Sequence, residues 1–340
     1  MYDPGTLYVD PILTNFSVGW QDQALYGERI MPVTPVRTPS GRYRTFDRSN
    51  WLVHESRREP GTVANEIQGA KWSEDNFHTE EQSLQVPIFD EERQQLTSQG
   101  GLADPVFGGA LQLNPELDAT ALATRSLLLA HELRVSTLVR DAANYGTDNK
   151  IDLSGGGGAG QYDNYTGGVA STSNPVANIM TAMRAIYSGT GRYPNTIVIP
   201  ALGMSYIENH PRIVDRFKTF SLTQPDAFQK LTGFEGTILP VDSHYNVANN
   251  LDATINIQPF WGKDVWVGIV DPNPTLNQFT FGKTFAQIYP DGSTRPTDRW
   301  REEPRKADII RVSYKWDLKI VSALAGYLIK NAFSSAAFSQ

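Results

Sequence analysis

The feature that most constrains this chain is a long helical pattern from about Asn114 to Asn144. Asn114 can cap its start, Pro115 suits the first helical position, and the acidic residues that follow favour the positive end of a helix. Apolar residues recur on one stripe: Leu117, Ala121, Leu128, Val135 and Ala142, widened by Leu122, Leu129, Leu133 and Leu138. At the usual rise per residue this helix would be roughly 45 Å long. Because that far exceeds the average helix, we expect it to be the backbone of the architecture.

The chain before this helix has an extended character. Prolines punctuate residues 1–60, and proline both fixes φ and removes an amide donor. Between Gly41 and Asp47, charged residues alternate with Tyr, Thr and Phe, which favours a strand. The stretch from Phe77 to Phe89 favours a returning strand. This excursion is polar on both faces, and a segment that cannot bury itself within its own chain often does so against another.

Short helices and strands alternate beyond the long helix. Residues 154–160 contain four consecutive glycines and predict an exposed, mobile loop. A second helix is predicted from Asn174 to about Ser188. Strands are predicted at residues 195–200, 237–241, 265–270, 309–314 and 319–321. Because these strands are too few and too irregularly spaced for a doubly wound sheet, the pattern predicts an α+β fold.

The composition argues against several classes of protein. A net charge of −7 does not suit a chain whose task is to grip nucleic acid, because phosphate contacts require a basic surface. The absence of cysteine removes disulfides, thiolate metal sites and thiol nucleophiles. No signal peptide is recognisable at the N-terminus, and the longest near-apolar stretch, Ile320 to Ile329, is about half the length that spans a bilayer. We therefore expect a soluble protein without a membrane partner.

No constellation of residues points to catalysis. The glycine run lacks the Lys and Ser or Thr of a phosphate-binding loop. The carboxylates of Asp90-Glu91-Glu92 and Glu302-Glu303 are neighbours in sequence, so on a strand they would point to opposite faces and be solvated. The histidines have no metal-like spacing, and packed or solvent-facing side chains are favoured over ligands for His54, His78, His131, His210 and His244. The sequence predicts no catalytic, cofactor-binding or metal-binding residues, and hence no enzyme.

Two charge-rich runs that contain Trp lie at Trp51 to Pro60 and at Asp298 to Lys306. Two interpretations are open: ordinary solvated loops, or an intersubunit surface of ion pairs and stacked rings, where Arg and Trp are enriched. Isolated surface pairs contribute little, but many equivalent contacts multiply small terms. On the second interpretation the predicted interface residues are Trp51, Arg57, Arg58, Arg299, Trp300, Arg301 and Glu302 of these runs. Arg42, Tyr43 and Arg44 of the polar excursion are predicted to join them.

Several segments, taken in this order, resemble the major capsid proteins of tailed phages with the Hong Kong 97-type fold. The resemblance runs over nearly the whole chain. Its most specific part begins at Arg299-Trp300-Arg301-Glu302-Glu303 and continues through Lys315 to Asn331-Ala332-Phe333. The other parts are Gly41-Arg42-Tyr43-Arg44 through Arg58-Glu59-Pro60-Gly61-Thr62, the long helix to Asp141, Tyr193-Pro194-Asn195-Thr196 through His210-Pro211-Arg212-Ile213, Trp261-Gly262-Lys263-Asp264 and Asp271-Pro272-Asn273-Pro274.

The resemblance implies a division of the chain. Residues 1–35 would be an N-terminal arm, and residues 36–92 an extended β-hairpin loop that lies over a neighbouring subunit. The helix at about 114–144 would be the spine of a peripheral domain made of residues 93–149 and 281–340. Residues 150–280 would form an axial domain that meets its copies around five- and six-fold axes. Since the chain starts on the arm, a separate scaffolding protein, or none, would be implied.

The implied function is that of a self-assembling structural subunit. Its pentamers and hexamers would build an icosahedral shell around double-stranded DNA, without sequence-specific binding. Scaffolding, portal and decoration proteins would be its further partners. Assembly as a procapsid would take place in the host bacterial cytoplasm, and the final location would be the virion capsid. The acidic charge would suit a lining along which packed DNA slides.

Three alternatives remain open from the residues alone. An encapsulin-like compartment shell shares the implied fold and would enclose cargo enzymes. A carbohydrate-active enzyme is suggested by the acidic charge with seven Trp and fourteen Tyr, but it would need carboxylates that converge in a cleft. A phage tail or adhesion protein should contain β-repeats, and none is apparent.

Overall fold

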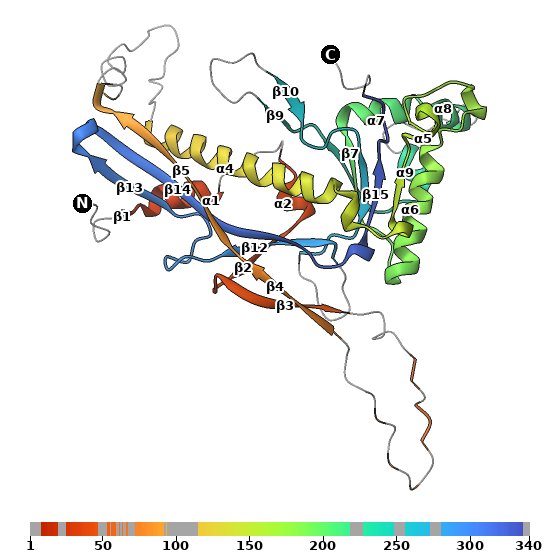
Figure 1. Cartoon of the computed structure of the whole chain (residues 1–340), viewed down its shortest axis with the longest axis horizontal. Coiled ribbons are helices and arrows are strands. Elements are labelled where there is room, and N and C mark those ends of the chain that lie inside the picture. The colour runs from red at the N-terminus through yellow and green to blue at the C-terminus, as the bar shows by residue number, and fades with distance from the viewer. Residues whose placement is uncertain are drawn as a thin grey trace.

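A computed structural model describes residues 8–19, 25–46, 53–54, 56–58, 61, 63, 66, 72–91, 93, 115–217, 227–247, 256–272 and 280–335. The described chain forms two sheets joined by one long helix, with a β-ribbon that leads away from the body (Figure 1). None of the helices in these ranges is both long and apolar enough to cross a membrane. The predicted α+β class is confirmed, since helices and strands are mixed without a doubly wound sheet.

The first sheet is centred on its longest strand, β14 (Ala307–Ile320). The strand order is β1-β13-β14-β12-β2, and β5 (Glu80–Phe89) pairs with the other edge of β14. Every pairing is antiparallel except that of β12 with β2. The remaining strands are β1 (Tyr8–Val9), β2 (Val33–Val36), β12 (Gly282–Gln287) and β13 (Thr297–Glu302). Two short helices, α1 (Pro11–Gly19) and α2 (Gly27–Ile30), lie between β1 and β2 in the chain.

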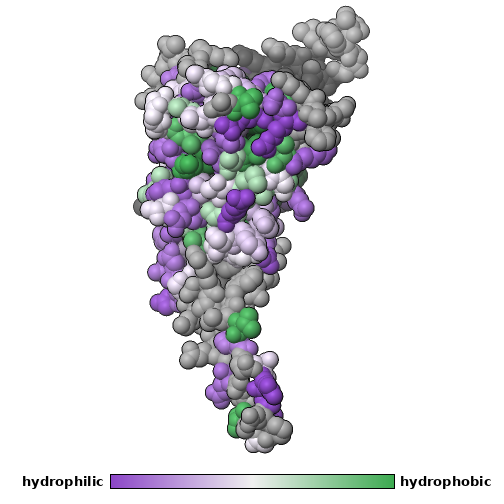
Figure 2. All heavy atoms as spheres, turned by 90° about the vertical axis from the view of Figure 1, so that its right-hand side faces the viewer, coloured by the Kyte–Doolittle hydropathy of each residue, from purple (hydrophilic) through white to green (hydrophobic). Residues whose placement is uncertain are grey.

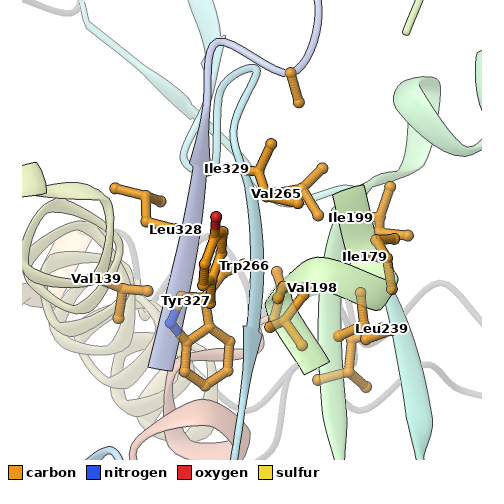
Figure 3. Packing of buried hydrophobic residues seen from close by; sticks show 14 of the residues in the cluster. Val139, Ile179, Val198, Ile199, Leu239, Val265, Trp266, Tyr327, Leu328 and Ile329 are labelled. Carbon is orange, nitrogen blue, oxygen red and sulfur yellow. The ribbon is translucent and has the colours of Figure 1, made fainter. Parts of the chain in front are cut away.

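The second sheet has the order β6-β15-β11-β7-β8 and is the better-buried of the two. Its strands are β6 (Lys150–Asp152), β7 (Thr196–Pro200), β8 (Thr237–Val241), β11 (Val265–Gly268) and β15 (Gly326–Lys330). All residues of β7 and β11 are buried. Such continuous apolar strands are expected where both faces of a sheet are covered. Figure 3 shows Val198, Val265, Trp266 and Leu328 packed together between helices and strands.

Helices and small elements surround this second sheet. The longest is α6 (Pro175–Thr190), capped by the Asn174 side chain and ended by Gly191 in a left-handed conformation. The others are α5 (Gly155–Gly158), α7 (Ala201–Glu208), α8 (Pro211–Phe217) and α9 (Ala227–Thr232), and a small hairpin is formed by β9 (His244–Asn246) and β10 (Ile257–Pro259). The predicted second helix is confirmed. The loop predicted to be exposed over residues 154–160 is exposed at residues 154–157, but Gly158 is buried and residues 155–158 form α5. The mobility of this segment stays a prediction.

The predicted long helix is confirmed as α4 (Pro115–Arg140), followed by a 3-10 turn at Ala142–Asn144. The predicted cap Asn114 lies outside the described residues. The predicted apolar stripe is right at Leu128 and Val135, which are buried, and wrong at Leu122 and Leu133, which are 58% and 37% exposed. Polar residues take their place on the buried face: Thr120, Thr124, His131, Glu132 and Ser136.

The helix has this mixed buried face because it packs against two cores in succession. Its first half, with Ala123 and Leu127, packs against alternate residues of β14, and its last turns, with Val135 and Val139, enter the core of the second sheet. A single helical period predicts one buried face along the whole helix, so it cannot predict a face that changes where the helix passes from one core to the other. Polar residues therefore occupy buried positions that a single amphipathic period assigns to Leu.

The excursion predicted from residues 36–92 is a β-ribbon. Strand β3 (Ser40–Phe46) pairs antiparallel with β4 (Trp72–His78), in register from Ser40 with His78 to Phe46 with Trp72. The predicted returning strand Phe77–Phe89 is divided into β4 and β5 at Thr79, whose amide N–H donates to the carbonyl of Pro39. Beyond this point β5 pairs antiparallel with β14. The resemblance implies one peripheral domain that combines the long helix with residues 281–340. In the structure β14 belongs to the first sheet, beside this helix, but β15 belongs to the second sheet.

Candidate assembly surfaces and subunit junction

The root of the β-ribbon is clamped to the first sheet by aromatic rings. Phe77 of β4 stacks on Phe285 of β12 with ring centroids 4.6 Å apart, and Tyr43 of β3 lies 5.2 Å from the same ring. Gly41 passes beneath Phe77, where an added Cβ would lie 2.8 Å from the ring. Only Gly allows this close approach of the two strands. The direction in which the ribbon leaves the body is therefore set by a packed contact.

Polar bonds complete this root. The Tyr43 hydroxyl donates to Asp75 at 2.8 Å, and the His78 amide donates to Asp317 of β14 at 2.8 Å. Burial and the bond to Asp75 raise the pKa of Tyr43, and the same bond lowers the pKa of Asp75. Tyr43, predicted as an interface residue, thus has an intramolecular role at the root.

The other predicted ribbon residues that the structure describes are exposed: Arg42, Arg44, Arg57 and Arg58. Arg42 and Arg44 both approach Glu74 across the ribbon, at 3.2 and 4.0 Å. Exposed pairs of this kind contribute only about 0–1 kcal/mol. Trp51 lies outside the described residues. Beyond the paired strands Val53 is 98% and Val63 85% exposed, so apolar side chains stand there without cover from their own chain.

The second predicted run begins in β13, continues through a 3-10 turn at Glu303–Arg305 and takes part in an ion-pair network. Arg301 grips Asp90 with two bonds of 2.6 Å, at the end of β5. Arg299 bonds Glu116 of α4 at 2.9 Å and Asp308 of β14 at 3.2 Å. Arg93 reaches Asp308 at 2.6 Å. Burial alone would raise the pKa of Asp308, but the three guanidinium groups hold it below its usual value.

This network ties two strands to the start of the long helix at one tip of the first sheet. The Arg311 guanidinium lies over the Trp300 ring, with its Cζ 5.3 Å from the ring centroid. Glu302 pairs with Arg305 at 3.4 Å. The run Arg299 to Glu302 therefore has partners within its own chain. Its predicted role between subunits stays a prediction, and the same side chains would need a second set of contacts to fulfil it.

A site that sequence reasoning missed lies at Glu132, in the middle of α4. This side chain is only 1% exposed and forms no ion pair in the described part of the chain. Its Oε1 accepts from Trp261 Nε1 at 2.7 Å, and its Oε2 accepts from the amides of Tyr26, at 3.1 Å, and Gly27. Burial raises the pKa of Glu132, against the opposing effect of these hydrogen bonds.

The Glu132 site brings three parts of the chain to one point. Tyr26 and Gly27 begin α2, Glu132 belongs to α4, and Trp261 precedes β11 of the second sheet. The next helical contact repeats the connection, since Arg140 bonds Asp264 at 2.7 Å and the carbonyl of Phe260 at 3.0 Å. The signal in the sequence that could have revealed this site is a Glu within the predicted apolar stripe. Glu is almost never buried without partners, so its presence there indicates a buried polar contact.

Within the described ranges, no group of three or more His, Asp and Glu side chains could hold a metal ion. The packed interpretation of His131 is confirmed: it is buried, its Nε2 lies 3.2 Å from the Thr284 hydroxyl, and burial lowers its pKa to about 3. His210 is buried beside Ser173, at 3.1 Å. Of the carboxylates considered for acid–base chemistry, Asp90 and Glu302 are in ion pairs, and Glu92 lies outside the described residues.

Comparison with known proteins identifies phage proteins. No family model matches the chain. The major capsid protein of Burkholderia phage BcepMu is 27% identical over 210 residues, which cover 62% of this chain and 61% of that protein. The chain therefore spans about three fifths of the length of this curated relative.

Two solved structures have a similar fold. A phage-related protein from Bordetella bronchiseptica RB50 superposes with a TM-score of 0.70 and 24% identity, covering 96% of this chain and 98% of that one. The capsid structure of the cyanophage P-SCSP1u gives a TM-score of 0.55 and 11% identity over 92% of this chain and 89% of that one. The chain thus has the fold of a phage capsid protein, and the predicted resemblance to phage major capsid proteins is confirmed.

Proposed function

We propose that this protein is the major capsid subunit of a tailed phage and assembles with its own copies into a closed shell. The observation that carries the proposal is its sequence relationship to a phage major capsid protein. The capsid fold over nearly the whole chain supports it. The protein would act as a structural element, not as an enzyme.

The form of the subunit supports an assembly role. The β3–β4 ribbon leaves the body from a rigid aromatic root (Figure 1). A ribbon of two strands is at best marginally stable when isolated. Since the ribbon's outer face and the apolar residues beyond it are exposed, a neighbouring subunit is the natural surface on which they become buried. Residues 36–92 would be this brace, and residues 1–35 the arm.

The finer organisation of the shell belongs to the same proposal. Pentamers and hexamers would form around the second-sheet unit, which comprises residues 150–280 together with β15. Residues 93–149 and β14 would form the periphery. The shell would enclose double-stranded DNA without sequence-specific contacts, since a net charge of −7 repels phosphate. Scaffolding, portal and decoration proteins would be partners, with assembly in the host bacterial cytoplasm and a final place in the virion capsid.

The alternatives are less favoured. The curated relative is a phage capsid protein, which favours a virion over an encapsulin-like compartment. A carbohydrate-active enzyme would require free carboxylates that converge, whereas Asp90 and Glu302 are held by arginines.

Sedimentation of the purified protein, followed by electron microscopy of any fast fraction, tests the proposal. Closed or tubular particles of megadalton mass are expected, alone or with a co-expressed candidate scaffold, and nuclease-resistant DNA should be found in particles from infected cells. Protein that stays monomeric under all these conditions, or particles filled with an enzyme cargo, would contradict the proposal.

A further inference from the structure

The two apolar cores of the subunit meet at a polar junction. The core clusters of the first sheet contain Ala119, Ala123 and Leu127 of α4, whereas the large cluster of the second sheet contains Val135 and Val139. Between these two sets, the buried face of the helix passes through His131 and Glu132. The boundary between the cores therefore coincides with two polar residues. The ring of His131 packs edge-on against Trp316 of the first core, with centroids 4.9 Å apart, whereas Glu132 is held by hydrogen bonds.

Glu132 carries the connection across this boundary. Its two carboxylate oxygens divide their donors: Oε1 accepts from the Trp261 indole of the second-sheet unit, and Oε2 from the Tyr26 and Gly27 amides of the N-terminal segment. The fit is close, because a Cβ on Gly27 would lie 2.7 Å from Oε2. One side chain thus holds two separate parts of the chain to the long helix.

The surroundings of Glu132 allow its hydrogen bonds to open at a low cost in free energy. Its partners are neutral, namely the three N–H groups and the Ser243 hydroxyl, and no cation forms an ion pair with it among the described residues. A buried carboxylate in such a site retains a desolvation penalty that hydration would relieve. Burial accordingly raises its pKa. An apolar contact has no such relief on opening, because water does not solvate it favourably.

We propose that Glu132 is a releasable lock. Its hydrogen bonds hold the Trp261 loop and the Tyr26–Gly27 turn to helix α4, and their rupture lets the two sheets change their relative angle while each core stays folded. In a shell, such a change would let one sequence fit different positions, and this consequence rests on the function proposed above. The lock itself is a property of the single subunit.

Hydrogen–deuterium exchange of the full soluble chain tests the lock, with Glu132→Gln as the main variant. Gln offers one acceptor and one donor group, so it cannot satisfy both sets of N–H donors. We expect exchange in peptides covering residues 25–31 and 260–264 to be at least about tenfold faster, because one buried N–H donor loses its acceptor. Exchange in β14 and β15 should stay within about twofold of the parent.

Two outcomes would overturn the lock. Unchanged exchange at residues 25–31 and 260–264 would mean that Glu132 does not hold them. A uniform increase that includes β14 and β15 would mean that Glu132 only supports the global fold. Glu116→Gln, in the same helix but in the tip network, is the matched control. It should change exchange around β13 and leave the Glu132 site unaffected.

Gly27→Ala provides an independent route if Glu132→Gln does not fold. Its methyl group would displace the carboxylate sterically, and it should accelerate exchange in the same two segments. Gly146→Ala is its control, because an added Cβ there meets nothing within 4 Å and its φ is −61°. Slow exchange in Gly27→Ala at residues 260–264 would contradict a shared lock.

The pH dependence of exchange gives a further readout. The charged or titratable groups around the site are His131 on α4, Tyr26 and Arg29 on the N-terminal segment and Asp242 after β8. His131 stays neutral above its pKa of about 3. Because burial disfavours the ionised carboxylate of Glu132, opening corrected for intrinsic exchange should increase in the parent as the pH rises through the folded-state pKa of Glu132. Glu132→Gln should lack this increase, and an equal increase in both would contradict the assignment.

Assembly is measured separately. If the parent never forms particles, the proposed function fails while the exchange result on soluble protein still decides the lock. If particles form, the angle between the two sheets in Glu132→Gln particles should differ measurably from the parent by electron microscopy. An identical angle in every subunit position would remove the shell role.

Discussion

The two sheets of this subunit differ in how they achieve their stability. Strands β7 and β11 of the second sheet are buried throughout, and their apolar side chains form the largest cluster of the described chain. The first sheet buries one face against α4 and carries exposed strand edges, ion pairs and the outgoing ribbon. Figure 2, which views the second-sheet end, shows a mainly polar surface with scattered apolar groups. The comparison teaches that the apolar core of the second sheet is closed by its own helices, which leaves, among the described residues, only outer side chains such as Tyr193 for contacts with copies. The first sheet instead leaves half of strand β5 and much of the ribbon exposed.

Removal of the ribbon's outer part should give the largest effect. Replacing residues 47–71 by a two-residue Asn-Gly turn joins Phe46 to Trp72, which are already paired. This design keeps the root and β5 intact. We expect a folded, soluble subunit with an unchanged melting temperature that forms no closed shell. Regular particles seen by electron microscopy would show that the first sheet does not depend on the ribbon for assembly.

Truncation of the second core should be the next largest effect. Trp266 is 1% exposed in the centre of β11, and Trp266→Ala should lower the free energy of unfolding by about 3–5 kcal/mol. Leu84→Ala on β5, where the side chain is 41% exposed, is the control and should cost less than about 1 kcal/mol. Chemical denaturation measures both values. Similar losses in the two variants would erase the proposed difference between the sheets.

The two regions should also respond oppositely to pH. The pKa of Asp308 is lowered in the folded state, so its contribution to stability is present above its unfolded pKa of about 3.9 and is lost as the pH falls through the folded value. The pKa of Glu132 is raised, so its contribution is present below about 4.3 and is lost as the pH rises through the folded value.

Unfolding free energies of the parent, Asp308→Asn and Glu132→Gln across pH 3 to 8 measure this contrast. The advantage of the parent over Asp308→Asn should shrink toward low pH, and its advantage over Glu132→Gln should shrink toward high pH. Parallel curves would indicate that neither carboxylate titrates differently on folding.

The smallest effect on stability is expected on the outer face of the ribbon. Arg42→Ala removes an exposed pair with Glu74 and should change the free energy of unfolding by less than about 0.5 kcal/mol. If Arg42 lies at an intersubunit contact, the yield of particles should fall while stability stays constant. Arg305→Ala, another exposed pair, is the control, and equal particle yields from both variants would argue against a special role of Arg42.

Patterns within single segments were predictable because they depend on neighbours in sequence. The start of α4 at Pro115, the β3 strand and the strands around Ile197 and Ile310 follow from local propensity and period. The division of the returning strand at Thr79 was not predictable, because it depends on a bond to Pro39, far away in the chain. For the same reason no local signal placed β15 beside β11.

The candidate site was predicted only in part. Arg and Trp in charged runs indicated a contact surface, and the structure found their partners within the chain: Asp90 for Arg301, and Asp308 and Glu116 for Arg299. Such partners come from other elements, so no spacing in sequence encodes them. Glu132 was missed because a charged residue in a helical period is ordinarily assigned to the solvent face.

The sequence by itself determined the classes of structure: a long amphipathic helix, an extended polar excursion, an α+β core and a resemblance to capsid proteins. These follow from composition, period and motif order, which are properties of the linear chain. Only the tertiary structure decided which face of α4 is buried and that two cores meet at Glu132. Burial is a property of the elements that surround a residue, and the donors of Glu132 lie 105, 106 and 129 residues away along the chain.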